Sequence, residues 1–279
     1  MPRARRITVG EITSPVIEAG PEDATEAVFF VHGNPGSSRD WDALVDAAGE
    51  LGRAVAVDMP GFGQASKPAN YDYTVTGYAT FIQGALEQLG ISRVHLVVHD
   101  FGGPFGLVWG LQHPDAWASV TLINIGILPG YTWHTLARRW RTPVLGELLQ
   151  LYIPRAAWRK QMQSSNPKGL PPAFVDQMYD NYDRGTRRTV LKLYRATPDP
   201  GEAAGEVGKA IKALNKPALV IWGMKDPFLP GRYADVQADY FDVKNTVKLP
   251  ESGHWCYQDD PDGVREALVP FLRERLAAS

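Results

Sequence analysis

The chain has 279 residues, of which 44% are hydrophobic and 22% charged. This balance is typical of a soluble globular protein built around one large domain. Its 29 basic and 31 acidic residues give a formal charge of -2, which argues against a nucleic-acid partner or an acidic membrane surface. Cys256 is the single cysteine, so an internal disulfide is impossible and we expect a cytoplasmic protein. No apolar run reaches the length of a signal segment or a membrane span.

The first half of the chain alternates strand and helix patterns. An edge hairpin is expected over 7–17, and buried strands are expected at 27–31, 54–57, 94–98 and 119–124. Between them, helical spacing covers 41–51, 74–89 and 105–111. Strands that alternate with helices in this way predict an α/β fold with a doubly wound, mostly parallel sheet.

The pattern changes between residues 127 and 200, where strand signals disappear and the sequence becomes helical, aromatic and rich in Arg and Pro. Strands return at 218–222 and 246–249, and an amphipathic helix is expected over 262–277. We therefore predict a core domain formed by 1–126 and 201–279, with a helical cap inserted at 127–200. Such a cap would lie over the carboxyl ends of the strands, where doubly wound sheets bind ligands.

An abrupt strand-to-helix turn occupies residues 94–104. A run rich in β-branched residues ends at Asp100, and Gly102 and Gly103 follow where side chains would strike neighbouring elements. This is the pattern of a nucleophile elbow, with an aspartate at its apex. Val98 departs from that pattern, which usually has a smaller residue two positions before the nucleophile.

Two further polar residues stand in loops just past expected strands. Asp226 follows 218–222, and His254 follows 246–249. Each alone is compatible with a turn cap or a surface histidine. The order nucleophile, acid, histidine nevertheless matches a catalytic triad on an α/β-hydrolase sheet. His95 and His99, in the strand before Asp100, are expected to have structural roles only.

Together with His32-Gly33-Asn34-Pro35, these motifs resemble the α/β-hydrolase-fold enzymes that use an aspartate nucleophile, the epoxide hydrolases and haloalkane dehalogenases. The resemblance covers nearly the whole chain. It implies that the Asp100 carboxylate attacks a saturated carbon of the substrate and is thereby converted to an alkyl ester. Water activated by His254 would then hydrolyse this ester. Asp226 would orient the imidazole.

The same resemblance implies an oxyanion hole formed by the backbone N–H groups of Asn34 and Phe101. Candidate pocket residues are Trp133, Trp255 and Phe228. No metal-ligand spacing or phosphate loop is visible, so neither a metal nor another cofactor is expected.

The leaving group distinguishes the two enzyme classes. Opening an epoxide generates an alkoxide, which needs an O–H donor, whereas expelling a halide needs two N–H donors in an apolar pocket. Tyr194 resembles the ring-opening tyrosine near the end of an epoxide-hydrolase cap. Tyr152 is the candidate for a second such tyrosine, with Tyr179 and Tyr182 as alternatives, although tyrosines in a cap often serve packing alone.

Asn34 is typical of haloalkane dehalogenases, in which this amide holds the halide. Those enzymes also carry a tryptophan after the nucleophile, and Phe101 has no N–H to donate. A cap tryptophan (Trp133, Trp140 or Trp158) could replace that donor, but loss of a buried donor typically costs a few kcal/mol of transition-state stabilisation. The sequence therefore favours an epoxide hydrolase.

Haloalkane dehalogenation with the same triad is the alternative, and a non-catalytic relative that binds a small molecule is a further one. The expected partners are a small apolar epoxide or halogenated substrate, and water.

Overall fold

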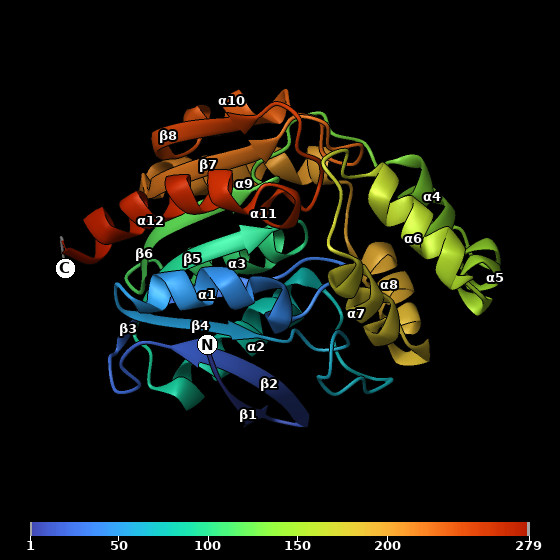
Figure 1. Cartoon of the computed structure of the whole chain (residues 1–279), viewed down its shortest axis with the longest axis horizontal. Helices are drawn as coiled ribbons and strands as arrows, with labels where there is room; N and C mark the ends of the chain where they lie inside the picture. The colour runs from blue at the N-terminus through green and yellow to red at the C-terminus, as the bar shows by residue number, and fades with distance from the viewer. Residues whose placement is uncertain (1, 278–279) are drawn as a thin grey trace.

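The computed structural model describes residues 2–277. Within this range a central sheet has the strand order β1-β2-β4-β3-β5-β6-β7-β8 (Figure 1). The strands β1 and β2 form an antiparallel hairpin at one edge, β2 is also antiparallel to β4, and the remaining pairs are parallel. The strands are β1 (Arg3–Val9), β2 (Ile12–Ala19), β3 (Glu26–Val31), β4 (Arg53–Val57), β5 (Arg93–His99), β6 (Trp117–Ile123), β7 (Pro217–Gly223) and β8 (Asp242–Leu249).

Helices cover both faces of this sheet, as a doubly wound fold requires. On one face lie α1 (Asp42–Gly49) and α12 (Pro261–Ala277), and on the other lie α2 (Val75–Leu89), α3 (Gly102–Gln112) and α9 (Pro200–Leu214) (Figure 1). Short elements complete the core: η1 (Ser38–Trp41), α10 (Tyr233–Val236), η2 (Gln237–Asp239) and α11 (Cys256–Asp259). The central strands β3, β5 and β6 read as apolar runs because they are buried on both sides.

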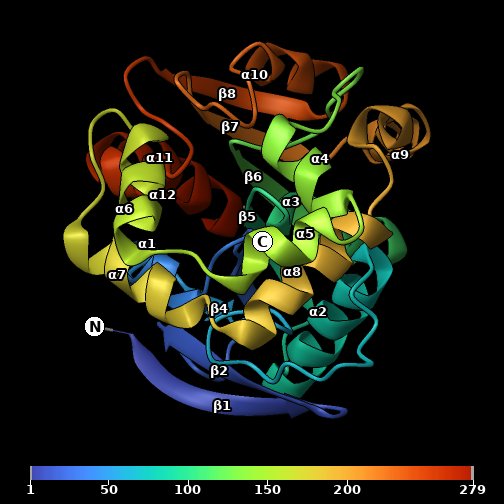
Figure 2. The same ribbon diagram turned by 90° about the vertical axis from the view of Figure 1, so that its right-hand side faces the viewer.

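Five consecutive helices form a separate layer beyond the carboxyl ends of the parallel strands (Figures 1 and 2). They are α4 (Thr135–Arg141), α5 (Leu145–Leu151), α6 (Arg155–Ser164), α7 (Pro172–Asn181) and α8 (Arg184–Ala196). No strand occurs between β6 and β7, as the change in sequence pattern predicts.

The expected strands and core helices are present, but α9 is an element that the sequence patterns did not indicate. It begins directly at Pro200 with Asp199 as its N-cap, and three glycines weaken its helical pattern. Packing of its buried face beside α3 offsets that low propensity.

Candidate active site

The apex of the turn between β5 and α3 is Asp100, whose φ of 50° lies in the left-handed region. Glycines allow the chain to turn so sharply. A Cβ at Gly102 would lie 2.1 Å from the carbonyl oxygen of Val31, and one at Gly103 would lie 2.3 Å from Ile125 Cγ1. The turn therefore requires both glycines and presents the Asp100 carboxylate at the carboxyl end of the sheet.

Val98 fits below this turn because α3 has a glycine opposite it. A Cβ at Gly106 would lie 2.9 Å from Val98 Cγ1, closer than two carbons pack. In the usual pattern the small residue lies on the strand, at position 98. Here the small residue lies on the helix, as Gly106, and Val98 fills the space beside it.

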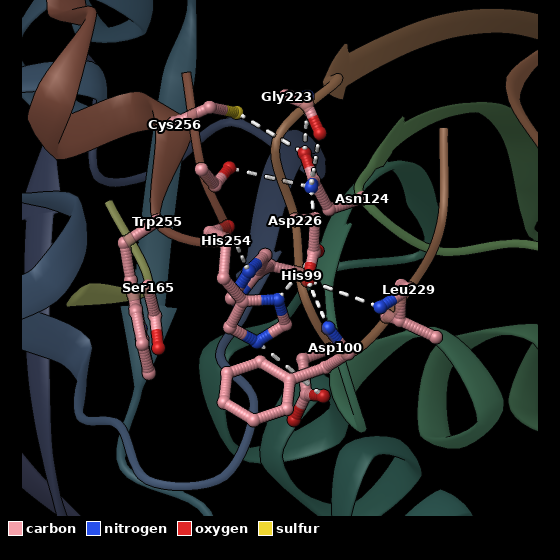
Figure 3. A network of polar contacts seen from close by, with 12 residues as sticks. His99, Asp100, Asn124, Ser165, Gly223, Asp226, Leu229, His254, Trp255 and Cys256 are labelled. Atoms are coloured by element: carbon pink, nitrogen blue, oxygen red, sulfur yellow. Dashed lines mark hydrogen bonds and ion pairs between the residues drawn. The ribbon is translucent and has the colours of Figure 1, made fainter. Parts of the chain in front are cut away.

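The side chains of Asp100, His254 and Asp226 meet at this edge of the sheet (Figure 3). Asp226 Oδ2 accepts a hydrogen bond of 2.7 Å from His254 Nδ1, while Asp226 Oδ1 accepts from the backbone N–H groups of Phe228 and Leu229 at 2.7 and 3.0 Å. On the other side of the imidazole, Nε2 lies 3.7 Å from Asp100 Oδ2. The carboxylate at 226 thereby fixes the tautomer, and Nε2 faces the second carboxylate.

The electrostatic environment of the three groups is consistent with an acid–base pair and a nucleophile. Burial raises the pKa of Asp100, although the His254 charge and the backbone N–H groups of Asn34 and Phe101 partly offset this rise. Burial alone would lower the pKa of His254, but the Asp226 carboxylate outweighs it and, with Asp100, raises that pKa above its ordinary value. Two nearby carboxylates therefore stabilise an imidazolium.

Two backbone N–H groups point at the nucleophile. The N–H of Asn34 donates to Asp100 Oδ1 at 2.7 Å, and that of Phe101 lowers the pKa of the same carboxylate. A Cβ at Gly33 would lie 2.4 Å from Asp100 Cβ, so only glycine lets this loop approach so closely. The arrangement can stabilise negative charge that develops on an Asp100 oxygen.

Asn124, at the end of β6, is a site residue that sequence reasoning missed. Its Nδ2 donates to Asp226 Oδ2 at 2.7 Å, and its Oδ1 accepts from the N–H of Gly223 at 2.8 Å (Figure 3). The asparagine adopts a φ of 47°, a conformation that asparagine tolerates better than most residues. A polar residue directly after a buried strand was the available signal.

A second contact that the sequence did not reveal holds His254 from behind. His99 Nε2 donates to the His254 carbonyl oxygen at 2.9 Å, because a carbonyl can only accept. From the segment between α6 and α7, the Ser165 carbonyl accepts from the His254 N–H at 3.1 Å, and Asn166 Oδ1 accepts from the Trp255 N–H at 2.8 Å. The backbone carrying the imidazole is thus fixed by both the core and the outer helical layer.

A cavity of about 550 Å³ opens between Asp100, His254 and the layer formed by α4 to α8. Its walls are mostly apolar, and they include all three predicted pocket residues, Trp133, Trp255 and Phe228, together with Tyr194. His134 also lines the cavity and was not anticipated; burial lowers its pKa to about 4, so it is neutral at neutral pH.

Tyr194 on α8 lies within this cavity close to the nucleophile. Its ring contacts Phe101 and Trp133 edge-on, at centroid distances of 5.0 and 5.1 Å. Burial and the Asp100 charge raise the pKa of Tyr194 well above its ordinary value, and the Asn34 side chain offsets part of that rise. The hydroxyl therefore keeps its proton and can donate it in a hydrogen bond.

The expectation for Tyr152 is wrong. This residue follows α5, and its side chain is 76% exposed and does not line the cavity. Tyr179 also lies apart from the cavity and donates to the Ile153 carbonyl at 2.8 Å. Of the alternatives, Tyr182 does line the cavity, and its hydroxyl accepts from Gln150 Nε2 at 2.9 Å. Which face a short cap helix turns inward depends on packing between helices, which local sequence does not specify.

Three N–H donors of residues in the cavity wall lack hydrogen-bond partners among the described residues. They are the side-chain amide of Asn34 and the indole nitrogens of Trp133 and Trp255. The amide lies close enough to Tyr194 to affect its pKa, but without a hydrogen bond of regular geometry. The Trp158 indole instead donates to the Val175 carbonyl at 3.3 Å. Trp133 is therefore the cap tryptophan that has a free donor beside Phe101.

Among residues 2–277, no group of three or more His, Cys, Asp or Glu side chains is placed to hold a metal ion. In the same range, no helix is both long and apolar enough to cross a membrane.

Comparison with known proteins gives a consistent relationship. Residues 26–261 match a family described as alpha/beta hydrolase fold. A haloalkane dehalogenase of Psychrobacter cryohalolentis is 28% identical, covering 92% of this chain and 86% of its own. The crystal structure of a haloalkane dehalogenase from Bradyrhizobium elkani, 23% identical, covers 100% of both chains with a TM-score of 0.86. An epoxide hydrolase from an endophytic Streptomyces, 21% identical, covers 100% of this chain and 97% of its own with a TM-score of 0.82. At these identities the structural likeness shows the fold alone.

Proposed function

The chain belongs to the alpha/beta hydrolase fold family, and on that premise we propose that this hydrolase opens an apolar epoxide to a vicinal diol through an alkyl ester on Asp100. The observation that carries the proposal is the buried Tyr194 hydroxyl, an O–H donor in an apolar cavity beside the nucleophile. Epoxide opening needs such a donor because the ring oxygen leaves as an alkoxide. We further propose that residues 127–200 act as the cap of this site, and that the protein works in the cytoplasm.

In the first step an Asp100 oxygen attacks one epoxide carbon, and the bond from that carbon to the ring oxygen breaks. Tyr194 donates its proton to the departing oxygen, so an ester and a neighbouring hydroxyl result. The backbone N–H groups of Asn34 and Phe101 hold the carboxylate, with that of Asn34 bound to Oδ1. This interaction orients the nucleophile before the substrate arrives.

In the second step His254 takes a proton from water, and the hydroxide attacks the carbonyl carbon of the ester. Asp226 stabilises the imidazolium that forms. Charge that builds on the carbonyl oxygen is stabilised by the N–H groups of Asn34 and Phe101. Collapse breaks the bond between the ester carbonyl carbon and the alkoxide oxygen, and the alkoxide takes the proton from the His254 imidazolium to leave as the diol. The carboxylic acid left on Asp100 gives its proton through water to the Tyr194 phenolate, so that one epoxide and one water give one diol.

Haloalkane dehalogenation is the second candidate, because of two of the unpartnered N–H donors in the cavity wall, Asn34 Nδ2 and Trp133 Nε1. A departing halide needs such a pair, and the curated relative from Psychrobacter cryohalolentis carries the name haloalkane dehalogenase. The ester chemistry on Asp100 would be the same. Only the group that receives the leaving atom would differ.

A paired assay separates the candidates: diol formation from styrene oxide and halide release from 1-bromobutane. For an epoxide hydrolase, Tyr194→Phe should lower diol formation by roughly a hundredfold or more, whereas Trp133→Phe should change it little. Tyr152→Phe, at an exposed tyrosine, is the matched control and should match the wild type. Halide release that is lost in Trp133→Phe but kept in Tyr194→Phe would instead assign dehalogenation.

A further inference from the structure

The outer end of the cap carries a cluster of exposed apolar side chains. Among residues 2–277, every large hydrophobic side chain classed as exposed lies in one stretch of nine residues. We call this stretch the cap-tip patch; it consists of Val144, Leu145, Leu148, Leu149, Leu151 and Tyr152, with exposures from 37% to 76%. Large apolar side chains gathered on one surface usually mark a binding surface.

The patch lies on and beside α5, the part of the cap farthest from the sheet. Figure 1 shows α5 at the outer end of the molecule, and in Figure 2, turned by 90°, the same helix faces the viewer. The two views agree that nothing in the described chain covers this side of α5. A flat surface could therefore reach it without meeting the core.

The helical layer that carries the patch has an excess of positive charge. Residues 135–196 contain twelve Lys and Arg against four Asp and Glu, whereas the rest of the chain contains 17 against 27. Arg138 and Arg139 on α4, which packs against α5, are exposed and form no ion pair with any described residue. The overall charge of -2 conceals this concentration of positive charge on the cap.

The patch is also continuous with the active-site cavity. Leu149, a member of the patch, lines the cavity, and so does Ile153 just beyond the patch. The same short segment thus borders both the active-site cavity and the cap-tip patch on the surface. An apolar molecule that left a hydrophobic phase at the patch would meet the cavity wall directly.

We propose that the cap-tip patch docks the enzyme on the surface of an anionic lipid bilayer. Apolar side chains with flanking arginines are the combination that binds such an interface, the former entering the headgroup region and the latter attracting anionic headgroups. A second copy of this chain fits less well, because two positive caps would repel each other. The absence of a helix long enough to span a bilayer within residues 2–277 agrees with attachment at the surface.

Vesicle co-sedimentation at low salt tests the proposal. The wild-type protein should bind vesicles of equal parts phosphatidylglycerol and phosphatidylcholine, and should not bind phosphatidylcholine alone. The double variants Leu148→Gln/Leu151→Gln and Arg138→Gln/Arg139→Gln should each weaken binding roughly tenfold or more. Arg265→Gln/Arg273→Gln, at exposed arginines of α12, is the charge-matched control and should bind like the wild type. Thermal unfolding of each variant checks that it is folded.

A second measurement reports the orientation on the bilayer. Because the native Cys256 is buried, a cysteine introduced by Tyr152→Cys can be labelled selectively with an environment-sensitive fluorophore. Its emission should shift to the blue on phosphatidylglycerol vesicles, and the same label on Arg273→Cys should not shift.

Three results would overturn the proposal. The first is no binding to the anionic vesicles. The second is binding that Leu148→Gln/Leu151→Gln leaves unchanged, which would indicate charge attraction alone. The third is a dimer that this variant dissociates, without vesicle binding, which would assign the patch to a second copy of the chain.

Discussion

At the scale of single residues, two aspartates within one site are set apart by their surroundings. Asp226 accepts three short hydrogen bonds from N–H groups that hold it in place, and a fourth from the imidazole. Asp100 is held through one oxygen and faces the cavity with the other. The first is suited to stabilising a cation, and the second to forming a bond.

The covalent step can be tested by removing the base. His254→Gln should still allow Asp100 to be alkylated but should block hydrolysis of the ester, because no group is left to take a proton from water. Intact-protein mass spectrometry after incubation with styrene oxide should show an adduct of the substrate's mass. The double variant Asp100→Asn/His254→Gln is the control and should remain unmodified, and an unmodified His254→Gln protein would contradict the two-step scheme.

The pH dependence of alkylation follows from the Asp100 pKa, which burial raises above its usual value of 3.8. Only the carboxylate attacks, so the alkylation rate should fall as the pH decreases through this raised pKa. The His254 charge lowers the Asp100 pKa, and its removal in His254→Gln should move the fall to higher pH. Single-turnover alkylation rates across pH measure this shift. The variant His113→Gln, outside the cavity, should leave the profile in place, and a shift toward lower pH in His254→Gln would contradict the assignment.

Sequence patterns pointed to Asp100, Asp226 and His254 because each lies at or shortly after the end of a strand, and the structure brings their side chains together. They did not identify Asn124, His99 or the cap residues behind His254, whose roles depend on contacts between segments distant in the chain. Tyr152 shows that local sequence can also suggest a site residue wrongly. Its place in the sequence resembles a known motif, but its side chain lies at the surface.

At the scale of elements, the strand-to-helix turn at Asp100 depends on backbone packing. Gly102→Ala would bring a Cβ to 2.1 Å from the Val31 carbonyl oxygen, so it should lower the free energy of unfolding by about 2–3 kcal/mol. Gly205→Ala is the matched control. That position lies in α9 and is open, with no atom within 4 Å of the added Cβ, so alanine should raise the stability by about 0.5–1 kcal/mol. Urea unfolding measures both, and equal effects would contradict the packing argument.

The central strands could be predicted because a strand buried on both faces is a continuous apolar run in the sequence. The core helices could be predicted because a helix buried on one face repeats its apolar residues with the helical period. The helix α9 could not, since its glycines and flanking prolines suggest a loop and its stability comes from packing beside α3. The orientation of α5 was equally inaccessible, because seven residues carry too short a period to define an inward face.

At the scale of the whole molecule, the layer of helices α4 to α8 and the core are joined at His254 and Trp255. Asn166→Ala removes the side chain that accepts from the Trp255 N–H, so the imidazole should lose its position and ester hydrolysis should slow roughly tenfold or more. The alkylation burst, which does not use the base, should keep its rate. Gln163→Ala removes two hydrogen bonds within the same cap segment but none to the core, and should leave both phases unchanged. Equal slowing in both variants would contradict this positioning role.

The hydrogen bond from the His254 N–H to the Ser165 carbonyl has a consequence for turnover. A Cβ at Gly253 would lie 2.0 Å from the Ser165 carbonyl oxygen, so the two backbones are in direct contact. If the segment at Ser165 moved away from the core to release product, the hydrogen bond would displace His254, the group that we propose takes the proton from water. For the proposed reaction, we therefore expect that ester hydrolysis and an open exit on that side exclude each other, so the alkyl ester stays enclosed until water has hydrolysed it.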